Sequence, residues 1–327
     1  MKDQFGRNID YLRLSLTDRC NLRCVYCMPE EGILQTSHEE ILRFHEIIRI
    51  CTVMADLGIE KIKLTGGEPL VRKNCADLIR SLKEIPGIRQ VTLTTNGVLL
   101  EEQMAELAAA GLDGINISLD TTDPEEFAKI TRRDDFEKVM RGIRAAMHYP
   151  NILLKINSVA ISSEDENYVR LARFAKDAPV HVRFIEIMPI GYGKKYHFRS
   201  EDSVVQALEK EYGVLHPVEE RLGNGPCHYY SINDFQGKIG FISAMTHRFC
   251  DQCNRIRLTS EGYLKLCLQY EKGADLKNVL RNGASDEELA KTILAAMEQK
   301  PIGHRFLEEQ RLGIEEKKTL IMSKIGG

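Results

Sequence analysis

Short runs of apolar and β-branched residues alternate with helical periodicity over the first 215 residues of the chain. The runs predicted to form strands are residues 11–16, 61–65, 91–95, 114–118, 153–159 and 182–187. The segments with helical spacing of apolar residues are 38–57, 75–83, 101–110, 136–147, 167–176 and 203–211. This alternation predicts a parallel sheet with right-handed crossovers. Six strand-helix units cannot close an eight-stranded barrel, so we expect an α/β fold built on an incomplete TIM-like barrel.

The pattern changes near residue 215, where Gly223, Gly225 and Pro226 interrupt the chain. Shorter alternating runs follow at residues 229–232, 238–243, 254–259 and 263–266, with helices at 276–280 and 286–298. We therefore expect a partial barrel over residues 1–215 and a smaller mixed extension over residues 216–327. The pattern leaves open whether a linker separates the two or the extension continues the first core.

One face of each predicted strand carries polar residues, although a closed barrel normally fills its interior with bulky apolar side chains. The pairs that share a face are Arg13 with Ser15, Lys63 with Thr65, Thr92 with Thr94, Asn116 with Ser118, and Lys155 with Asn157. A polar interior indicates a buried ligand, and the alternative is that these faces are simply hydrated. Lys155 is flanked by apolar residues, and a buried ammonium needs a partner.

Composition narrows the class of protein. The 327 residues include 45 Lys and Arg against 48 Asp and Glu, a formal charge of −3. No field over the whole surface would attract nucleic acid or anionic lipid, so an anion must be bound locally. Without a long apolar run or a leader at the N-terminus, the chain is expected to be cytoplasmic, with no membrane and no nucleic acid partner. Nine cysteines, six of them in two tight clusters, favour reduced thiolates that hold metal over a disulfide framework.

The first cysteine cluster comprises Cys20, Cys24 and Cys27, spaced C-x3-C-x2-C directly after the first strand. Thiolates this close on one loop can hold an iron–sulfur cluster, which usually takes four cysteines. Three ligands would leave one iron open to a small molecule, as in catalytic metal sites. The alternative is a structural zinc site, for which His38 is the nearest histidine.

The second cluster comprises Cys250, Cys253 and Cys267, spaced C-x2-C-x13-C. By itself this spacing is ambiguous, because a zinc ribbon uses similar distances with a fourth ligand, and His247 is close in sequence. Three cysteines have no expected ligand role: Cys51, Cys75 and Cys227. The first two lie in helical segments and are expected to be buried thiols.

Two motifs together resemble the radical S-adenosylmethionine superfamily. They are the C-x3-C-x2-C loop with Tyr26 before its last cysteine, and the run Gly66-Gly67-Glu68-Pro69 after the second strand. The second cysteine set, the N-R-I-R run at residues 254–257 and the terminal Gly326-Gly327 resemble one family within it, the GTP 3′,8-cyclases of molybdenum cofactor biosynthesis. The resemblance covers nearly the whole chain, including KLTGGEPLVR, ISLD and KPIGH.

The resemblance implies two 4Fe-4S clusters as cofactors, together with S-adenosylmethionine. The first cluster would reduce S-adenosylmethionine to a 5′-deoxyadenosyl radical, which removes the 3′ hydrogen of GTP so that C3′ attacks C8 of guanine. The second would contact the guanine. The resemblance also implies partners: an external electron donor, the next pathway enzyme (cyclic pyranopterin monophosphate synthase) as product acceptor, and a possible homodimer. The alternatives are a peptide-modifying maturase with an auxiliary cluster and a non-enzymatic zinc or iron–sulfur module.

The resemblance also assigns residues to ligands. S-adenosylmethionine would contact Tyr26, Gly67, Ser118 and Met188. GTP would be bound by Arg13, Lys63, Thr94, Lys155, Arg255, Ile256 and Arg257, since a triphosphate is well held by guanidinium and ammonium donors. The catalytic assignment falls on Gly326 and Gly327, which would reach back into the active site.

Three further expectations concern neighbouring residues. The lack of side chains at Gly66 and Gly67 would let the methionine part of the cofactor approach the backbone closely. Arg72 could add to the positive lining of the site. Residues 130–134 are expected on a connecting loop, where Arg132 stands at a position at which the family more commonly has glycine.

Overall fold

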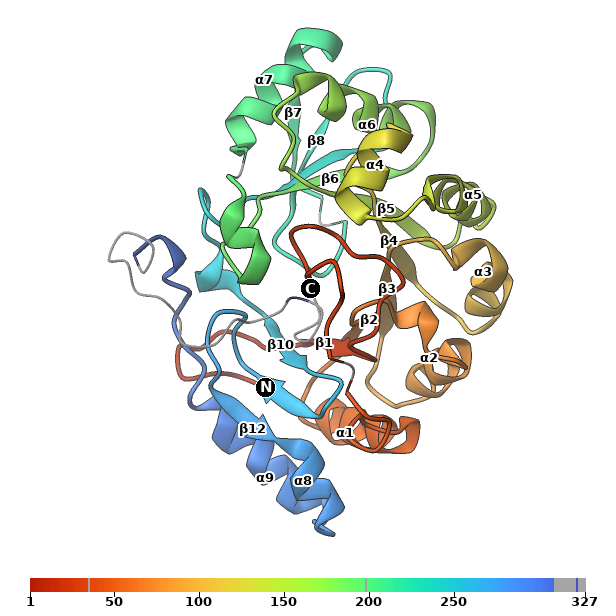
Figure 1. The fold of residues 1–327 in the computed structure, drawn as a ribbon. Coiled ribbons are helices and arrows are strands. Elements are labelled where there is room, and N and C mark those ends of the chain that lie inside the picture. Colours follow the sequence, from red (N-terminus) through yellow and green to blue (C-terminus); the bar gives the residue numbers. More distant parts are fainter. Residues whose placement is uncertain (35, 198, 221, 309–321, 323–327) are drawn as a thin grey trace.

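A computed structural model of the chain describes residues 1–34, 36–197, 199–220, 222–308 and 322. Their strands form one open sheet in the order β12-β11-β10-β1-β2-β3-β4-β5-β6-β9-β8-β7 (Figure 1). The six central strands run parallel: β1 (Tyr11–Ser15), β2 (Lys61–Thr65), β3 (Gln90–Thr95), β4 (Gly114–Ser118), β5 (Leu153–Val159) and β6 (His181–Ile185). The expected six-unit incomplete barrel is confirmed.

The C-terminal region adds strands to both edges of this sheet. β10 (Arg255–Leu258) pairs parallel to β1, and β9 (Ile239–Ile242) pairs parallel to β6. The outer strands are antiparallel: β11 (Tyr263–Lys265) and β12 (Gly273–Asp275) beyond β10, and β8 (His228–Ser231) and β7 (His216–Val218) beyond β9. The extension therefore continues the first sheet, which answers the question that the sequence pattern left open. The division at residue 215 stays a prediction.

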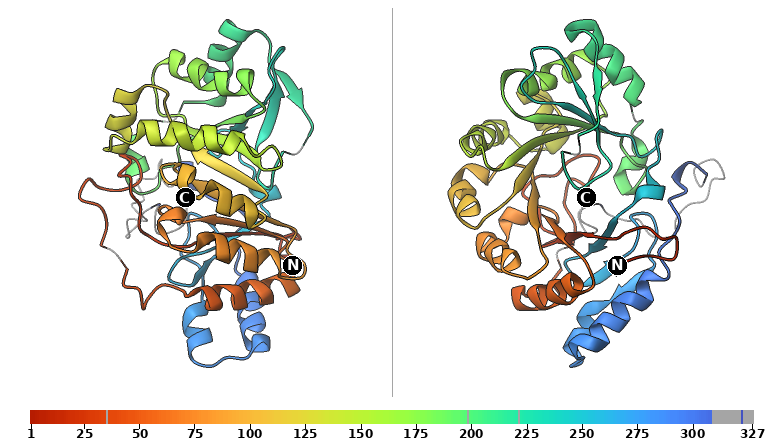
Figure 2. Two further views of the ribbon diagram at one scale, coloured as in Figure 1. Left: turned by 90° about the vertical axis from the view of Figure 1, so that its right-hand side faces the viewer. Right: turned by 180° about the vertical axis from the view of Figure 1, so that it is seen from behind.

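Helices cover the outer face of the central strands (Figures 1 and 2). They are α1 (Phe44–Asp56), α2 (Cys75–Lys83), α3 (Leu100–Ala109), α4 (Pro124–Thr131), α5 (Phe136–Met147), α6 (Asp165–Asp177) and α7 (Glu201–Tyr212). Two more, α8 (Leu276–Arg281) and α9 (Asp286–Met297), pack beside β11 and β12. No helix in the part of the chain that the structure describes has both the length and the apolar character needed to cross a bilayer.

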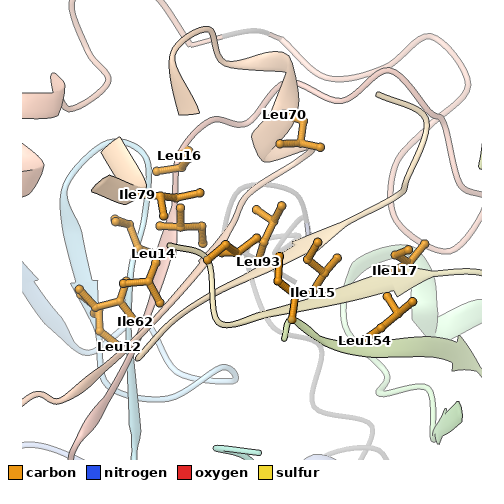
Figure 3. Close-up of a cluster of buried hydrophobic side chains, with 14 of the residues drawn as sticks. Leu12, Leu14, Leu16, Ile62, Leu70, Ile79, Leu93, Ile115, Ile117 and Leu154 are labelled. Atoms are coloured by element: carbon orange, nitrogen blue, oxygen red, sulfur yellow. The ribbon is translucent and has the colours of Figure 1, made fainter. Parts of the chain in front are cut away.

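Residue alternation in the strands separates the core from the polar interior. Leu12 and Leu14 of β1 are fully buried, as are Ile62 of β2 and Leu93 of β3, and these side chains meet Ile79 of α2 (Figure 3). Each such side chain contributes about 1.5–3 kcal/mol when it leaves water. Because successive side chains in a strand point to opposite faces, burying these positions turns their polar neighbours to the inner face.

Helix α4 was not expected, and the expectation that residues 130–134 form a loop is wrong at its first two positions. The Asp123 side chain caps the helix by accepting a hydrogen bond from the Glu126 amide at 2.8 Å, and Pro124 occupies the first turn. Its eight residues bury only Phe127, Ile130 and Thr131. Two helical turns are too short for a clear 3.6-residue period, which explains why the pattern did not reveal it.

Candidate functional site

A cavity of about 390 Å³ lies on the polar side of the sheet, a volume typical of small-molecule sites. Both cysteine sets line it, since Cys20, Cys24, Cys27, Cys250, Cys253 and Cys267 all face this one space. The other predicted site residues that line it are Arg13, Tyr26, Lys63, Gly67, Thr94, Ser118, Lys155, Met188, Arg255 and Arg257. The sheet thus brings together segments that are more than 200 residues apart.

Strand register explains how the basic residues gather. Arg13 of β1 stands opposite Lys63 of β2 on one side and Arg257 of β10 on the other. Asn116 of β4 stands opposite both Thr94 and Lys155, and its amide donates a hydrogen bond to the Thr94 hydroxyl at 3.2 Å. Residues that pair in register share a face, so two polar rows run across the inner surface of the sheet.

The positive charges of these rows repel one another. Burial, followed by Arg183, Arg13 and Lys155, lowers the pKa of Lys63 well below its usual value. Burial and then Arg183 lower the pKa of Lys155 to about 7. Among the described residues neither Lys63 nor Lys155 forms an ion pair with an acidic side chain. An anionic ligand would supply the missing counter-charge.

Sequence reasoning missed Arg183, which lines the same cavity. Its guanidinium donates from Nε and Nη2 to Asn157 Oδ1, at 2.8 and 2.5 Å. It stands opposite Asn157 in the register of β5 and β6, so the alternation rule applied to residues 182–187 could have revealed it. A charge in the middle of an apolar strand was the available signal.

The first cysteine loop follows β1 and rests on the loop that follows β2. The Gly67 amide donates to Thr17 O at 2.7 Å, and the Glu68 amide donates to Arg19 O at 2.8 Å. A Cβ atom at Gly67 would lie 2.3 Å from Arg19 O, and Gly66 has a φ of +146°. These glycines are therefore needed for packing between the two loops, in addition to the close ligand approach that the sequence suggested.

Two buried carboxylates stand beside the first loop. Glu68 accepts hydrogen bonds from the amides of Leu70 and Asn96 and from the Thr95 hydroxyl, and burial raises its pKa to about 7. Asp120, which sequence reasoning did not single out, accepts from the Tyr26 hydroxyl at 2.6 Å. Burial raises the pKa of Asp120 to about 6. The ISLD run contained this residue, but its partner Tyr26 is 94 residues away.

The second cysteine loop is held by two cations that sequence reasoning also missed. Arg7 donates from Nη1 to Cys250 O at 2.8 Å. Lys300, whose side chain is buried, donates from Nζ to Arg255 O at 2.9 Å and to Leu266 O at 2.5 Å. Lys300 thereby joins the segment after Cys253 to the residue before Cys267.

The donor chemistry of both loops fits iron–sulfur clusters. The three thiols of each cysteine set line one cavity, with Cys267 reaching it from the segment after β11, and thiolates are the usual cluster ligands. Burial and then Glu68 raise the pKa of Cys20 to about 11. Burial also opposes ionisation of Cys253, but Lys300 and Arg255 outweigh it and lower the pKa of that thiol. A bound cationic cluster core would favour the thiolates at both loops.

Several predicted residues lie elsewhere. Ile256 points to the opposite face of β10 from Arg255 and Arg257, so its side chain is in the apolar core and does not line the cavity. The expectation for Arg72 is wrong, because its guanidinium donates to Leu16 O and Leu42 O and stacks on a phenylalanine ring. His247 contacts Glu201 rather than the cysteines. Gly326 and Gly327 lie outside the described residues.

Comparison with known proteins first identifies the class of protein to which the chain belongs. The Radical SAM superfamily matches residues 14–175, and Molybdenum Cofactor Synthesis C matches residues 180–306. The fold resembles that of Streptococcus suis SuiB bound to S-adenosylmethionine, with a TM-score of 0.60 and 16% identity over 98% of this chain and 76% of that one. The chain therefore has the fold and the sequence motifs of a radical S-adenosylmethionine enzyme.

Full-length relatives then identify the family. The chain is 44% identical to a GTP 3′,8-cyclase from Desulforamulus reducens and 43% identical to one from Clostridium perfringens, each match covering 100% of both chains. It is 45% identical to the GTP 3′,8-cyclase of Syntrophomonas wolfei over the same coverage. The chain belongs to the GTP 3′,8-cyclase family.

Proposed function

We propose that this chain is a radical S-adenosylmethionine lyase that converts GTP to (8S)-3′,8-cyclo-7,8-dihydroguanosine 5′-triphosphate, the first step of molybdenum cofactor biosynthesis. The observation that carries the proposal is the single cavity lined by two sets of three cysteines and by the cationic rows between them. When bound, the clusters and S-adenosylmethionine supply the radical that removes hydrogen from the ribose. The protein must hold GTP, fix its orientation and exclude water.

The triphosphate would be held by the cations on the inner face of β1, β2, β5 and β10. Arg13, Lys63 and Lys155 come from the first three of these strands, and Arg255 and Arg257 come from the last. Arg183 joins them from β6, and Thr94 adds a neutral donor. A triphosphate carries about four negative charges near neutrality, so it would offset the burial and the like-charge repulsion that lower the lysine pKa values. Only the backbone of Ile256 could take part.

The cofactor would occupy the side of the cavity next to the first cysteine loop. Tyr26 is fixed there by its hydrogen bond to Asp120, so that its ring stands at the cavity wall. Gly67 exposes backbone at the same wall, and Ser118 and Met188 line the space beyond it. We assign S-adenosylmethionine to these four residues, and the three thiols of each cysteine set to one 4Fe-4S cluster.

Other parts of the proposal rest on the family. An external electron donor must reduce the first cluster, and cyclic pyranopterin monophosphate synthase would take up the product. The proposal also includes a homodimer and a catalytic role of Gly326 and Gly327. It divides the chain into a barrel at residues 1–215 and an extension at residues 216–327. The sheet that spans both regions implies that the two would unfold together.

Product analysis tests the proposal. Anaerobically purified, reconstituted protein is incubated with S-adenosylmethionine, a chemical reductant and one nucleotide at a time, and the products are separated by mass. We expect 5′-deoxyadenosine and a cyclised product of unchanged mass with GTP, and no cyclised product with ATP. A colourless protein that contains zinc, or cleavage of S-adenosylmethionine without any nucleotide product, would contradict the assignment.

A further inference from the structure

Helix α4 ends against the first cysteine loop, and the contact is built from backbone groups. The last four carbonyls of a helix have no partner within it. Two of those in α4 are used here: Thr131 O accepts from the Arg23 amide and Ile130 O accepts from the Val25 amide, both at 2.9 Å. The last turn of α4 is thus hydrogen-bonded to the stretch of chain that carries Cys24.

Arg132, the next residue, returns hydrogen bonds in the other direction. Its Nη1 donates to Arg23 O at 3.0 Å and to Met28 O at 3.1 Å. Arg23 directly precedes Cys24, and Met28 directly follows Cys27. One guanidinium therefore joins the two ends of the segment that contains both cysteines.

The backbone of Arg132 adopts a conformation that costs free energy. Its φ and ψ are 54° and 31°, in the left-handed region that glycine and asparagine tolerate better than arginine. A strained residue persists where its surroundings over-determine it, often next to a functional site. Here the side-chain contacts to the cysteine loop are what a glycine at this position would lack.

We infer that Arg132 is a positioning residue for the first iron–sulfur cluster, because it clamps the segment between Arg23 and Met28 to the end of α4. The inference rests on the proposed function, through the assignment of Cys20, Cys24 and Cys27 to that cluster. Arg132 is not among the residues that line the cavity, so it would act through the cysteine loop. Its effect is to restrict movement of Cys24 and Cys27 relative to the barrel.

The test compares Arg132→Asn and Arg132→Gly with Arg133→Asn. Asparagine and glycine suit the left-handed backbone, so they remove the clamp without adding strain. The Arg133 side chain donates to Arg132 O at an exposed position and forms no hydrogen bond with the described residues of the cysteine loop, so Arg133→Asn is a matched control. Full-length protein with both clusters is exposed to an iron chelator under anaerobic conditions. Loss of the first cluster is followed through the paramagnetic resonance signal that changes when S-adenosylmethionine is added.

Both Arg132 variants should lose the first cluster roughly tenfold faster, because two hydrogen bonds that hold its ligands are gone. The second cluster, the melting temperature of the cluster-free protein and the Arg133→Asn control should be unchanged. Equal rates for the first cluster would overturn the inference, and so would faster loss of both clusters with a lower melting temperature, which indicates a purely structural role. If the unsubstituted chain does not bind two clusters, the proposed function itself fails.

Discussion

The two cysteine loops face the same cavity but are held in place by different means. The first is bound by backbone groups of the Gly66-Gly67 loop and of the end of α4, and by the side chain of Arg132. The second is also held by the side chains of Arg7, which donates to Cys250 O, and Lys300, which donates to carbonyls after Cys253 and before Cys267. The buried carboxylates Glu68 and Asp120 stand near the first loop in addition to its arginines, whereas Lys300 and Arg255 are the charged groups that act most on Cys253 of the second.

This difference in charge has a chemical consequence. Glu68 and Asp120 disfavour additional negative charge at the first loop, whereas Lys300 and Arg255 favour it at the second. An electron added to a cluster is additional negative charge, so if each cysteine set binds a cluster as proposed, we expect the lower reduction potential at the first. Under the proposed function, a stronger reductant at the first loop would suit cleavage of S-adenosylmethionine, and the basic second loop would suit binding of an anionic nucleotide.

The largest effect is expected when one cysteine is removed from each loop. Cys24→Ala should abolish 5′-deoxyadenosine formation, since the loop that faces Tyr26 and Gly67 loses a ligand. Cys253→Ala should abolish cyclisation of GTP while some uncoupled cleavage of S-adenosylmethionine continues. Both products are measured by mass in the same reaction. Coupled activity in either variant would mean that the loops do not divide the chemistry in this way.

Removing Arg257 separates nucleotide binding from cofactor cleavage. Arg257→Ala should weaken GTP binding about 10- to 100-fold, because a charge-assisted contact to phosphate contributes roughly 1.5–3 kcal/mol. Reductive cleavage of S-adenosylmethionine without GTP should stay near its original rate. Arg89→Ala is the control, since 76% of the Arg89 side chain is exposed. Parallel loss of both activities would show that the two binding regions are not independent.

Replacing Lys300 addresses the second loop directly and is the counterpart of the Arg132 test. Lys300→Met keeps an unbranched chain but leaves Arg255 O and Leu266 O without their donor. The second cluster should be lost roughly tenfold faster in chelator, and its potential should fall, while the first cluster is unaffected. The exposed Lys291, replaced in the same way, controls for the loss of one charge. An unchanged potential would remove Lys300 from the comparison.

How much of the site the sequence predicted depends on the sequence separation of the residues that interact. Alternation within single strands was enough to predict the polar inner face, and adjacent parallel strands then aligned Arg13 with Lys63 without further information. Sequence reasoning missed Asp120, Lys300 and Arg132 as contacts of the cysteine loops, because they hydrogen-bond residues that are 94, 45 and 109 positions away, respectively. Such partners depend on how helices and loops pack, which no local period records.

The smallest expected effect is a pH dependence of GTP affinity, which arises from a lysine outside both cysteine loops. Lys155 lies on β5, and its pKa of about 7 means that it loses its charge as the pH rises through neutrality in the unliganded protein. A triphosphate binds the ammonium form better and raises this pKa, so GTP affinity should be highest below pH 7. It should fall about fivefold between pH 7 and pH 8, with proton uptake on binding.

Calorimetry in two buffers of different ionisation enthalpy measures both the affinity and the proton uptake. Lys155→Arg keeps the positive charge at every pH in this range, so it should flatten the pH dependence of GTP affinity. Any pH dependence that remains we assign to Lys63, whose pKa is also lowered. Binding of S-adenosylmethionine alone should not follow this profile, because the lysines are on the strand face rather than on the first loop. If the binding of both ligands showed the same pH dependence, the titrating group would lie at the first cysteine loop. The assignment of the two ligands to separate parts of the cavity would then be wrong.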